Sequence, residues 1–387
     1  MQHYDVVIVG GGPAGISTAL HLQAAAPALR VVVLEKERYP REKICAGGIG
    51  ARAFRILEKI GVVVDCPCVP LEAVAMRIAG ETVVVNVPGC GAVVRRIEFD
   101  HAFANLAIAR GIEVRDGSPV ETIRVGDGGV TINDSIEARV LVGADGVAGI
   151  VRRQTGFPRG ELRAQAVELD TVGVAQDLPR DTVVFDFATS DLRGYAWDFP
   201  TVVDGAPLVC RGVYVLHDGK PHAPAEPRTR LTTYLAERGL DITRHRIKQF
   251  AERGFEPGAE ISVPRVLLVG EAAGIDIATG EGIGQAIEYG SVAGPYLANA
   301  LAENALDFSD WRQTIEKHHL GFQLAIRHGC YRAFYGRRRP KIERLMPKMT
   351  QLFRVGVQDF AGVPLSKLAI VHGAGQFLAA FARAKLA

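Results

Sequence analysis

A G-x-G-x-x-G fingerprint at residues 10–15 constrains the fold of this chain more than any other feature. An apolar run at 4–10 leads into it and is typical of a buried strand, and residues 16–20 begin a helix. A second apolar run at 31–34 ends in Glu35, which lies 20 residues after the last fingerprint glycine. Together these segments predict a βαβ unit, and therefore a parallel, doubly wound sheet at this end of the chain.

The fingerprint residues predict a nucleotide site. Gly10 permits a tight turn, Gly12 lets the backbone approach a pyrophosphate, and Gly15 lets helix and strand pack closely. The helix N-terminus presents free N–H groups and the positive end of its dipole to phosphates. We therefore expect a dinucleotide to bind here.

Glu35 and two later glycine clusters indicate which dinucleotide it is. A carboxylate at this position accepts hydrogen bonds from the adenosine ribose hydroxyls and disfavours a 2′-phosphate, which favours FAD or NAD over NADP. Glycine clusters at 143–146 and 270–284 follow apolar strands and are expected to return to the cofactor. A nicotinamide cofactor needs no such distant contacts, whereas the longer FAD extends across the sheet. The sequence therefore predicts FAD, bound non-covalently.

These motifs carry a resemblance that covers residues 1 to about 300. The chain resembles the geranylgeranyl-reductase family of FAD-dependent oxidoreductases, within the p-hydroxybenzoate-hydroxylase-like (group A flavin monooxygenase) superfamily. The matching segments are the fingerprint at 10–15, the Cys-x-Gly-Gly loop at 45–48, Arg-Ile-Glu-Phe-Asp at 96–100, Gly-Ala-Asp-Gly at 143–146, and the two glycine runs within 270–283.

The resemblance implies a set of FAD-binding residues. They are Gly10, Gly12, Pro13, Ala14, Gly15, Glu35, Lys36, Arg41, Cys45, Ala46, Gly47, Arg96, Val120, Asp145, Gly146, Gly270, Glu271, Gly280, Gly282 and Ile283. Arg96, at a helix start, is expected to pair with pyrophosphate or ribityl oxygens, unless it is a surface arginine. Glu271 stands where the family usually has Asp, and its longer side chain requires a small retreat of the backbone.

Residues 194–200 suggest a substrate wall, because they resemble the Tyr-x-Trp-x-Phe-Pro signature of the same family. On a strand, Tyr195, Trp197 and Phe199 point to one face and would form an aromatic wall beside the flavin, or a core-facing stripe. We take Tyr195 and Trp197, with Cys45, as the candidate catalytic residues. The downstream Gly-x-Gly of the family signature is replaced by residues 210–212, Cys-Arg-Gly.

Cys45 aligns with a loop cysteine that reductases of this family place near the flavin. Beside Lys43 and Arg41 its thiol is expected to have a lowered pKa and to donate a proton. The alternative is a small residue that allows close packing on the flavin.

The resemblance favours a reductase that transfers hydride from reduced FAD to a carbon–carbon double bond of a hydrophobic, isoprenoid-like substrate. The chain has no second nucleotide fingerprint, so NAD(P)H or a reduced carrier protein is expected to act as a transient electron donor. The alternative is an FAD-dependent monooxygenase that hydroxylates an aromatic substrate, free or carried on a protein. A flavin halogenase is disfavoured, because residues 60–94 hold no lysine. A non-catalytic FAD-binding protein is disfavoured by the aromatic wall.

We therefore expect an α/β fold. A Rossmann-type FAD-binding domain with a parallel sheet would be interleaved with a mixed or antiparallel β-sheet substrate domain and followed by a C-terminal helical region. The predicted boundaries are 1–70, 95–160 and 260–305 for the FAD-binding domain, 71–94 and 161–259 for the substrate domain, and 306–387 for the helical region.

Charge is distributed unevenly along a chain whose net charge is only +2. Residues 311–387 hold 14 Lys and Arg against three acids, so this segment carries +11 and the rest of the chain −9. The asymmetry predicts an anionic partner, either a membrane surface or an acidic protein, unless the segment docks on the acidic body of its own chain. Nothing resembles a reading helix for nucleic acid, so no nucleic-acid partner is expected.

Cysteine usage and hydropathy predict a cytoplasmic protein. Six cysteines without a C-x-x-C pair indicate neither a disulfide scaffold nor a metal site, and fit a reducing compartment. The uncharged run at 6–29 breaks at its glycines and has no basic region before it, so it is neither a secretion signal nor a membrane span. The uncharged run at 368–382 is too short to span a bilayer but can lie peripherally on one.

Overall fold

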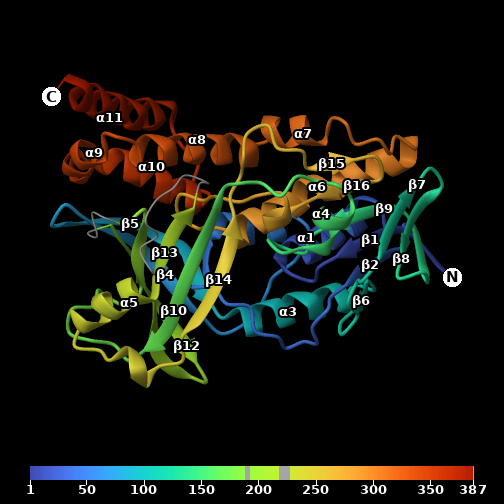
Figure 1. Cartoon of the computed structure of the whole chain (residues 1–387), viewed down its shortest axis with the longest axis horizontal. Helices are drawn as coiled ribbons and strands as arrows, with labels where there is room; N and C mark the ends of the chain where they lie inside the picture. The colour runs from blue at the N-terminus through green and yellow to red at the C-terminus, as the bar shows by residue number, and fades with distance from the viewer. Residues whose placement is uncertain (188–191, 218–226, 387) are drawn as a thin grey trace.

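The computed structural model describes residues 1–187, 192–217 and 227–386. Residues 188–191 and 218–226, both within the predicted substrate domain, lie outside the described residues, as does 387. The described strands form two sheets that lie side by side, and helices run along them (Figure 1). This is the α/β arrangement that the motifs predict.

The first sheet is built around the N-terminal strand. Its central pairs are all parallel, and the paired segments 6–9, 32–34, 140–143 and 266–268 are buried throughout. Both faces of a parallel sheet are covered, which explains why these strands read as continuous apolar runs. In spatial order the strands are β15 (Ser262–Val263), β16 (Val266–Leu268), β9 (Ile136–Gly143), β1 (Gln2–Val9), β2 (Val31–Leu34) and β6 (Glu113–Arg115), with β7 (Ile123–Gly126) and β8 (Gly129–Ile132) joined to the first half of β9.

Three helices pack with this sheet: α1 (Pro13–Ala25), α3 (Arg96–Ala109) and α6 (Ile283–Glu303). Helices α1 and α6 touch closely because α6 carries Gly290 and Gly294. A Cβ on either glycine would come within 2.5–2.6 Å of α1. The Ser17 hydroxyl of α1 also donates to the carbonyl of Ile287 at 2.7 Å. This packing brings the loops that begin the two helices to the same end of the sheet.

The second sheet is antiparallel except where β11 pairs with β4. In spatial order its strands are β14 (Lys248–Arg253), β10 (Arg163–Thr171), β13 (Ala206–His217), β12 (Gly194–Val203), β11 (Thr182–Asp186), β4 (Cys68–Ile78), β5 (Glu81–Val94) and β3 (Gly48–Gly50). Helix α5 (Pro227–Ala236) covers one face of this sheet through Leu231, Tyr234 and Leu235. Two short helices, α2 (Ala51–Glu58) and α4 (Ile150–Gln154), lie in the connections.

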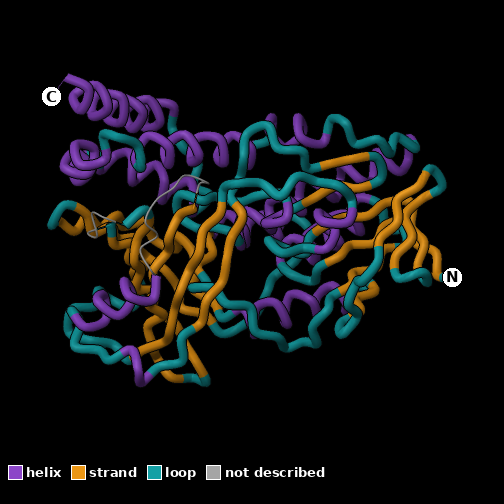
Figure 2. The backbone as a smooth tube through the Cα atoms, viewed as in Figure 1, coloured by secondary structure: helices purple, strands orange, loops and turns teal. Residues whose placement is uncertain are grey.

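The remainder of the chain is helical, as predicted. Its helices are α7 (Trp311–Lys317), α8 (His319–Phe334), α9 (Arg339–Leu345), α10 (Thr350–Phe360) and α11 (Lys367–Leu386). Figure 2 shows them as a layer along the strands, with α9, α10 and α11 gathered near the C-terminus. None of the described helices is both long enough and apolar enough to cross a membrane.

The C-terminal region is fastened to its own chain at several points. The indole N–H of Trp311 donates to the carbonyl of Leu268 in the first sheet at 3.1 Å. Asp359 of α10 accepts from Arg52 of α2 at 2.8 Å, and it also contacts His319 at 3.1 Å and Arg327 at 3.8 Å. Parts of this region therefore pack against the sheets and helices of the same chain.

Candidate active site

A cavity of about 1350 Å³ runs from the fingerprint to the C-terminal helices. It exceeds the ~300–1,000 Å³ typical of a pocket for one small ligand, so it has room for a cofactor and a substrate together. Every residue predicted from the sequence to bind the cofactor or to act in catalysis lines it, except Gly15 and Gly270. These two lie behind the wall, where a Cβ would meet the carbonyl oxygen of Gly10 at 1.9 Å and the Cβ of Ala14 at 2.5 Å.

The fingerprint end of the cavity is shaped for phosphate. Gly10 has a φ of +109°, and a Cβ there would lie 2.3 Å from the carbonyl oxygen of Ala144. Gly12 is different, because a Cβ there would point into the cavity, 3.8 Å from Nη2 of Arg41 and of Arg96. Two guanidinium groups therefore face the exposed backbone at the start of α1, an arrangement that suits a pyrophosphate.

Both arginines are held in place by carboxylates. Arg41 bridges Glu35 and Asp100 at 3.2 and 3.0 Å, and Arg96 makes two hydrogen bonds to Asp100 at 2.6 and 2.7 Å. Arg96 is thus a buried, oriented group rather than a surface arginine. The Glu35 carboxylate accepts the N–H of Gly11 at 2.9 Å and keeps further acceptor sites for a ribose.

Glu271 supplies the clearest sign that a polar ligand belongs in the cavity. Its Oε1 is buried and has no hydrogen-bond partner in the described structure, while Oε2 lies 3.9 Å from Nζ of Lys43. A buried acceptor without a partner is unfavourable unless a ligand satisfies it. A ribityl hydroxyl would do so, which means that the longer side chain at this position still fits FAD.

The other predicted cofactor residues complete the same walls. Lys36, Ala46, Gly47, Val120, Gly146, Gly280, Gly282 and Ile283 all border the cavity. Asp145 does too, but its carboxylate accepts the N–H of Val151 at 2.9 Å and so begins α4. Burial raises the pKa of this carboxyl.

The predicted aromatic wall is present on β12. Tyr195, Trp197 and Phe199 are buried on one face of the strand and line the cavity. Tyr195 stacks on Tyr214 of β13, with ring centroids 5.1 Å apart. Gly212 is required beside Trp197, because a Cβ there would lie 2.1 Å from the indole ring. The glycine that remains of the incomplete family signature therefore makes room for the tryptophan.

The expectation that Cys45 has a lowered pKa is wrong. Burial raises the pKa of its thiol to about 11. The neighbouring cations are directed elsewhere, Lys43 to Glu271 and Arg41 to Glu35 and Asp100. The Sγ atom accepts the N–H of Gly47 at 3.4 Å and borders the cavity, so the thiol is a protonated group at neutral pH.

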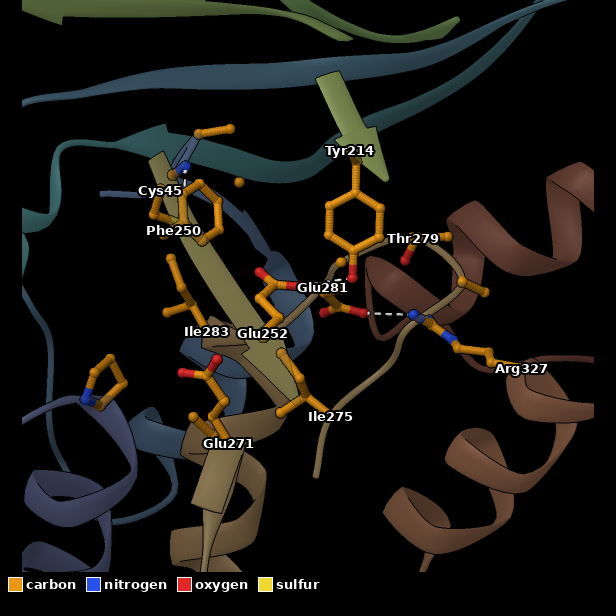
Figure 3. A pocket seen from close by; sticks show the side chains of 18 of the residues that line it. Cys45, Tyr214, Phe250, Glu252, Glu271, Ile275, Thr279, Glu281, Ile283 and Arg327 are labelled. Carbon is orange, nitrogen blue, oxygen red and sulfur yellow. Dashed lines mark hydrogen bonds and ion pairs between the residues drawn. The ribbon is translucent and has the colours of Figure 1, made fainter. Parts of the chain in front are cut away.

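Glu252 of β14 is a site residue that the sequence did not reveal. It is buried at the cavity wall, and the Tyr214 hydroxyl donates to its Oε2 at 2.7 Å. Burial, together with repulsion from Glu271, raises the pKa of Glu252 to about 8, so this carboxyl is largely protonated at neutral pH. Figure 3 shows it pointing into the pocket between Glu271 and Tyr214. No motif marks it, since β14 reads as an ordinary polar strand.

The loop between η2, a 3₁₀ turn at Gly270–Ala272, and α6 closes over these groups. A Cβ on Gly280 would lie 3.0 Å from the Tyr195 hydroxyl and 3.4 Å from Oε2 of Glu252. Arg327 of α8 fixes the loop, with Nη1 2.8 Å from both Asp276 and Glu281. Figure 3 shows its contact with Glu281. The C-terminal region therefore holds in place a loop that borders the aromatic wall.

Comparison with known proteins agrees with this arrangement. Residues 3–307 match the model of the FAD binding domain family. A digeranylgeranylglycerophospholipid reductase of Methanothrix thermoacetophila is 30% identical over 349 residues, which cover 81% of this chain and 84% of the relative. A rifampicin monooxygenase of Streptomyces venezuelae is 27% identical over 320 residues, covering 74% of this chain and 61% of the relative.

A solved structure shares the fold over nearly the whole chain. The geranylgeranyl bacteriochlorophyll reductase-like protein of Thermoplasma acidophilum superposes with a TM-score of 0.68 at 20% identity, covering 96% of both chains. The fold, the cavity and the matched relatives lead to one assignment. The chain is an FAD-dependent oxidoreductase that belongs to the FAD binding domain family and, within it, to the geranylgeranyl-reductase group.

Proposed function

We propose that this protein reduces a carbon–carbon double bond of a hydrophobic, isoprenoid-like substrate. The observation that carries the proposal is the continuity of the cavity. Its polar end has the groups that suit FAD, and its other end is apolar and deep. The relative from Methanothrix thermoacetophila, named as a reductase of a prenyl lipid, supports the same chemistry.

The polar end would hold the cofactor. The α1 N-terminus with Arg41 and Arg96 would bind the pyrophosphate, Glu35 the ribose, and Oε1 of Glu271 a ribityl hydroxyl. Reduced FAD bound there supplies a hydride to the substrate. The electron donor would be NAD(P)H or a reduced carrier protein that binds transiently.

The proton that complements the hydride would come from this chain. Cys45 and Glu252 both border the cavity, and both are protonated at neutral pH, because burial raises the pKa of each. Either group can protonate the second carbon of the double bond and regain its proton from solvent. The aromatic residues Tyr195 and Trp197 would orient the double bond and exclude water.

The apolar end would hold the remainder of a long chain. It is formed where the C-terminal helices face the second sheet, by residues that include Phe334, Tyr335, Met349, Phe353 and Phe377. These side chains offer large apolar surfaces, a suitable lining for a hydrocarbon tail.

Product analysis tests the proposal. The dithionite-reduced holoprotein, incubated without oxygen with a geranylgeranyl lipid, should yield a product with two more hydrogens per reduced bond. The second candidate function is hydroxylation of an aromatic compound, and the similarity to a rifampicin monooxygenase supports it. A product that forms only with oxygen present, and that contains an atom derived from labelled O₂, would establish the rival.

A further inference from the structure

Helix α11 is apolar on the side that packs against its own chain. Its Gly373 allows close approach to α10, since a Cβ there would lie 3.4 Å from Cα of Leu352. Gln376 accepts the N–H groups of Gln351 and Leu352 at 3.2 and 3.3 Å. Phe377 borders the apolar end of the cavity. One side of α11 is thereby fixed to the protein and covers the cavity.

The opposite side of α11 faces outward, and the side chains described on it include no Lys, Arg, Asp or Glu. Leu368, Val371 and Leu378 are 79%, 68% and 66% exposed. Their spacing places them on one face of a helix, and the other exposed side chains described along α11 are His372, Ala379 and Ala382. A helix on the surface of a water-soluble protein normally presents charged residues to solvent. We therefore expect another surface to bind this apolar face.

Exposed cations lie on neighbouring elements at the same end of the molecule. The exposed ones on and between α8 and α10 are Arg332, Arg337, Lys341, Arg344, Lys348 and Arg354. No acidic side chain of the described residues forms an ion pair with any of these six. The two acids in this stretch have other partners: Glu343 pairs with Arg339 at 2.6 Å, and Asp359 pairs with Arg52 at 2.8 Å. Figure 1 shows α9, α10 and α11 clustered together near the C-terminus.

We propose that this end of the molecule, the outer face of α11 with the six cations, docks on an anionic lipid bilayer. An uncharged helix face bordered by Lys and Arg is the pattern that binds at the lipid interface, with the apolar side chains inserted and the cations at the headgroups. A symmetric second copy of the chain is the poorer occupant, because a two-fold contact sets this positive end against itself. The bilayer would lie next to the helix that covers the apolar end of the cavity.

Vesicle flotation of the holoprotein tests the docking. Wild type should float with phosphatidylcholine vesicles that contain phosphatidylglycerol, and much less with phosphatidylcholine alone or at raised salt. The variant L368S/V371S/L378S should bind the anionic vesicles at least about tenfold more weakly. The matched control, V63S/V125S/V172S, removes exposed apolar groups elsewhere and should float like wild type. A charge variant, K341Q/R344Q/K348Q, should lose most of the anionic preference.

Three results would overturn the proposal. Wild type could stay in the soluble fraction with anionic vesicles at low salt. The α11 variant could float as well as its control, although both retain flavin and the wild-type melting temperature. Light scattering could reveal a dimer that the α11 variant abolishes, which would assign the face to a second copy. Docking and the proposed reaction fail separately, because a protein that does not float can still reduce a detergent-dispersed substrate.

Discussion

Gly10 and Gly12 lack side chains for different reasons, and substitution by Ala should distinguish a role in folding from a role in FAD binding. Ala at Gly10 meets a carbonyl oxygen at 2.3 Å and must adopt a φ of +109°, so G10A should lower the melting temperature of the flavin-free protein. Ala at Gly12 has only ordinary 3.8 Å contacts, so G12A should melt normally but bind FAD at least about tenfold more weakly. Thermal melting and a flavin-fluorescence titration check both. Normal FAD affinity in G12A would contradict the phosphate assignment.

Cys45→Ser measures whether the thiol takes part in the reaction. Ser is close in size and should keep FAD bound, because Cys45 contributes only one weak contact, to Gly47. If the thiol is the proton donor, turnover should fall by at least about tenfold. The rate of product formation at saturating substrate is the measurement. An unchanged rate would mean that Cys45 serves packing alone, and would leave Glu252 as the candidate proton donor.

Glu252→Gln is the matching test for the second acid, and the pH profile distinguishes the two. If Glu252 donates the proton, wild-type turnover should fall as the pH rises through about 8, where its carboxyl ionises. E252Q should be slower and lose this alkaline limb. If Cys45 donates, the fall should come nearer pH 11. An exposed acid of the following loop, changed in E260Q, is the control, and an unaltered alkaline limb in E252Q would exclude the carboxyl.

The glycine loops and the aromatic face could be predicted because each is a local pattern. A strand followed by glycines fixes a turn, and alternate aromatic residues on a strand share a face. The importance of Glu252 could not be read in this way. It depends on the pairing of β14 with β10 and on Gly280, which approaches from a distant part of the chain. The prediction of a lowered pKa for Cys45 was wrong because the thiol is buried. The cations close to it in the sequence also pair with carboxylates elsewhere in the fold.

At the scale of elements, we expect the contact between α8 and the loop before α6 to be the most sensitive to substitution. Arg327 neutralises two carboxylates, those of Asp276 and Glu281, at 2.8 Å each. Replacing it with Met leaves both acids without their cation, which should destabilise the fold by about 3–5 kcal/mol. Because Glu281 precedes the cavity-lining Gly282, FAD affinity should fall as well.

The control for R327M lies on the same helix. R332M makes the identical change at an exposed arginine for which the described residues provide no ion pair, so denaturant unfolding should shift little. Equal stability of the two variants would show that the Arg327 ion pairs contribute nothing net. The sequence also could not predict that the C-terminal helices form a wall of the cavity. The basic residues there indicate an anionic partner, and the apolar residues between them carry no motif.

At the scale of the molecule, buried titratable groups give the stability a definite pH dependence. The pKa of Glu168 is raised to about 7 and that of Glu252 to about 8, in both cases first by burial. Stabilisation from these protonated acids is complete below about pH 4.5 and is lost as the pH rises through 7 and 8. Hydrogen bonds to Asp359 and Glu288 raise the pKa of His319 to about 9, so its contribution is present below about pH 6.5 and is lost towards pH 9.

All three groups act in the same direction, so the melting temperature should decline from about pH 5 to pH 9. Calorimetry of the holoprotein across this range is the measurement. The double variant E168Q/E252Q should flatten the decline below about pH 8 and keep the part that His319 causes. A melting temperature that increases with pH over the same interval would contradict the assignment of protonated buried acids.

The cavity described above is encoded in two separate stretches of the gene. The residues proposed to hold FAD all precede α7, whereas the wall of the apolar end is formed largely by α8, α10 and α11. Mutations in the final helices can therefore change which tails are admitted while the groups for FAD stay intact. Selection for a new substrate can therefore change the last helices without altering the residues proposed to hold FAD. Exchanging these helices between relatives would let an engineer change substrate preference in the same way.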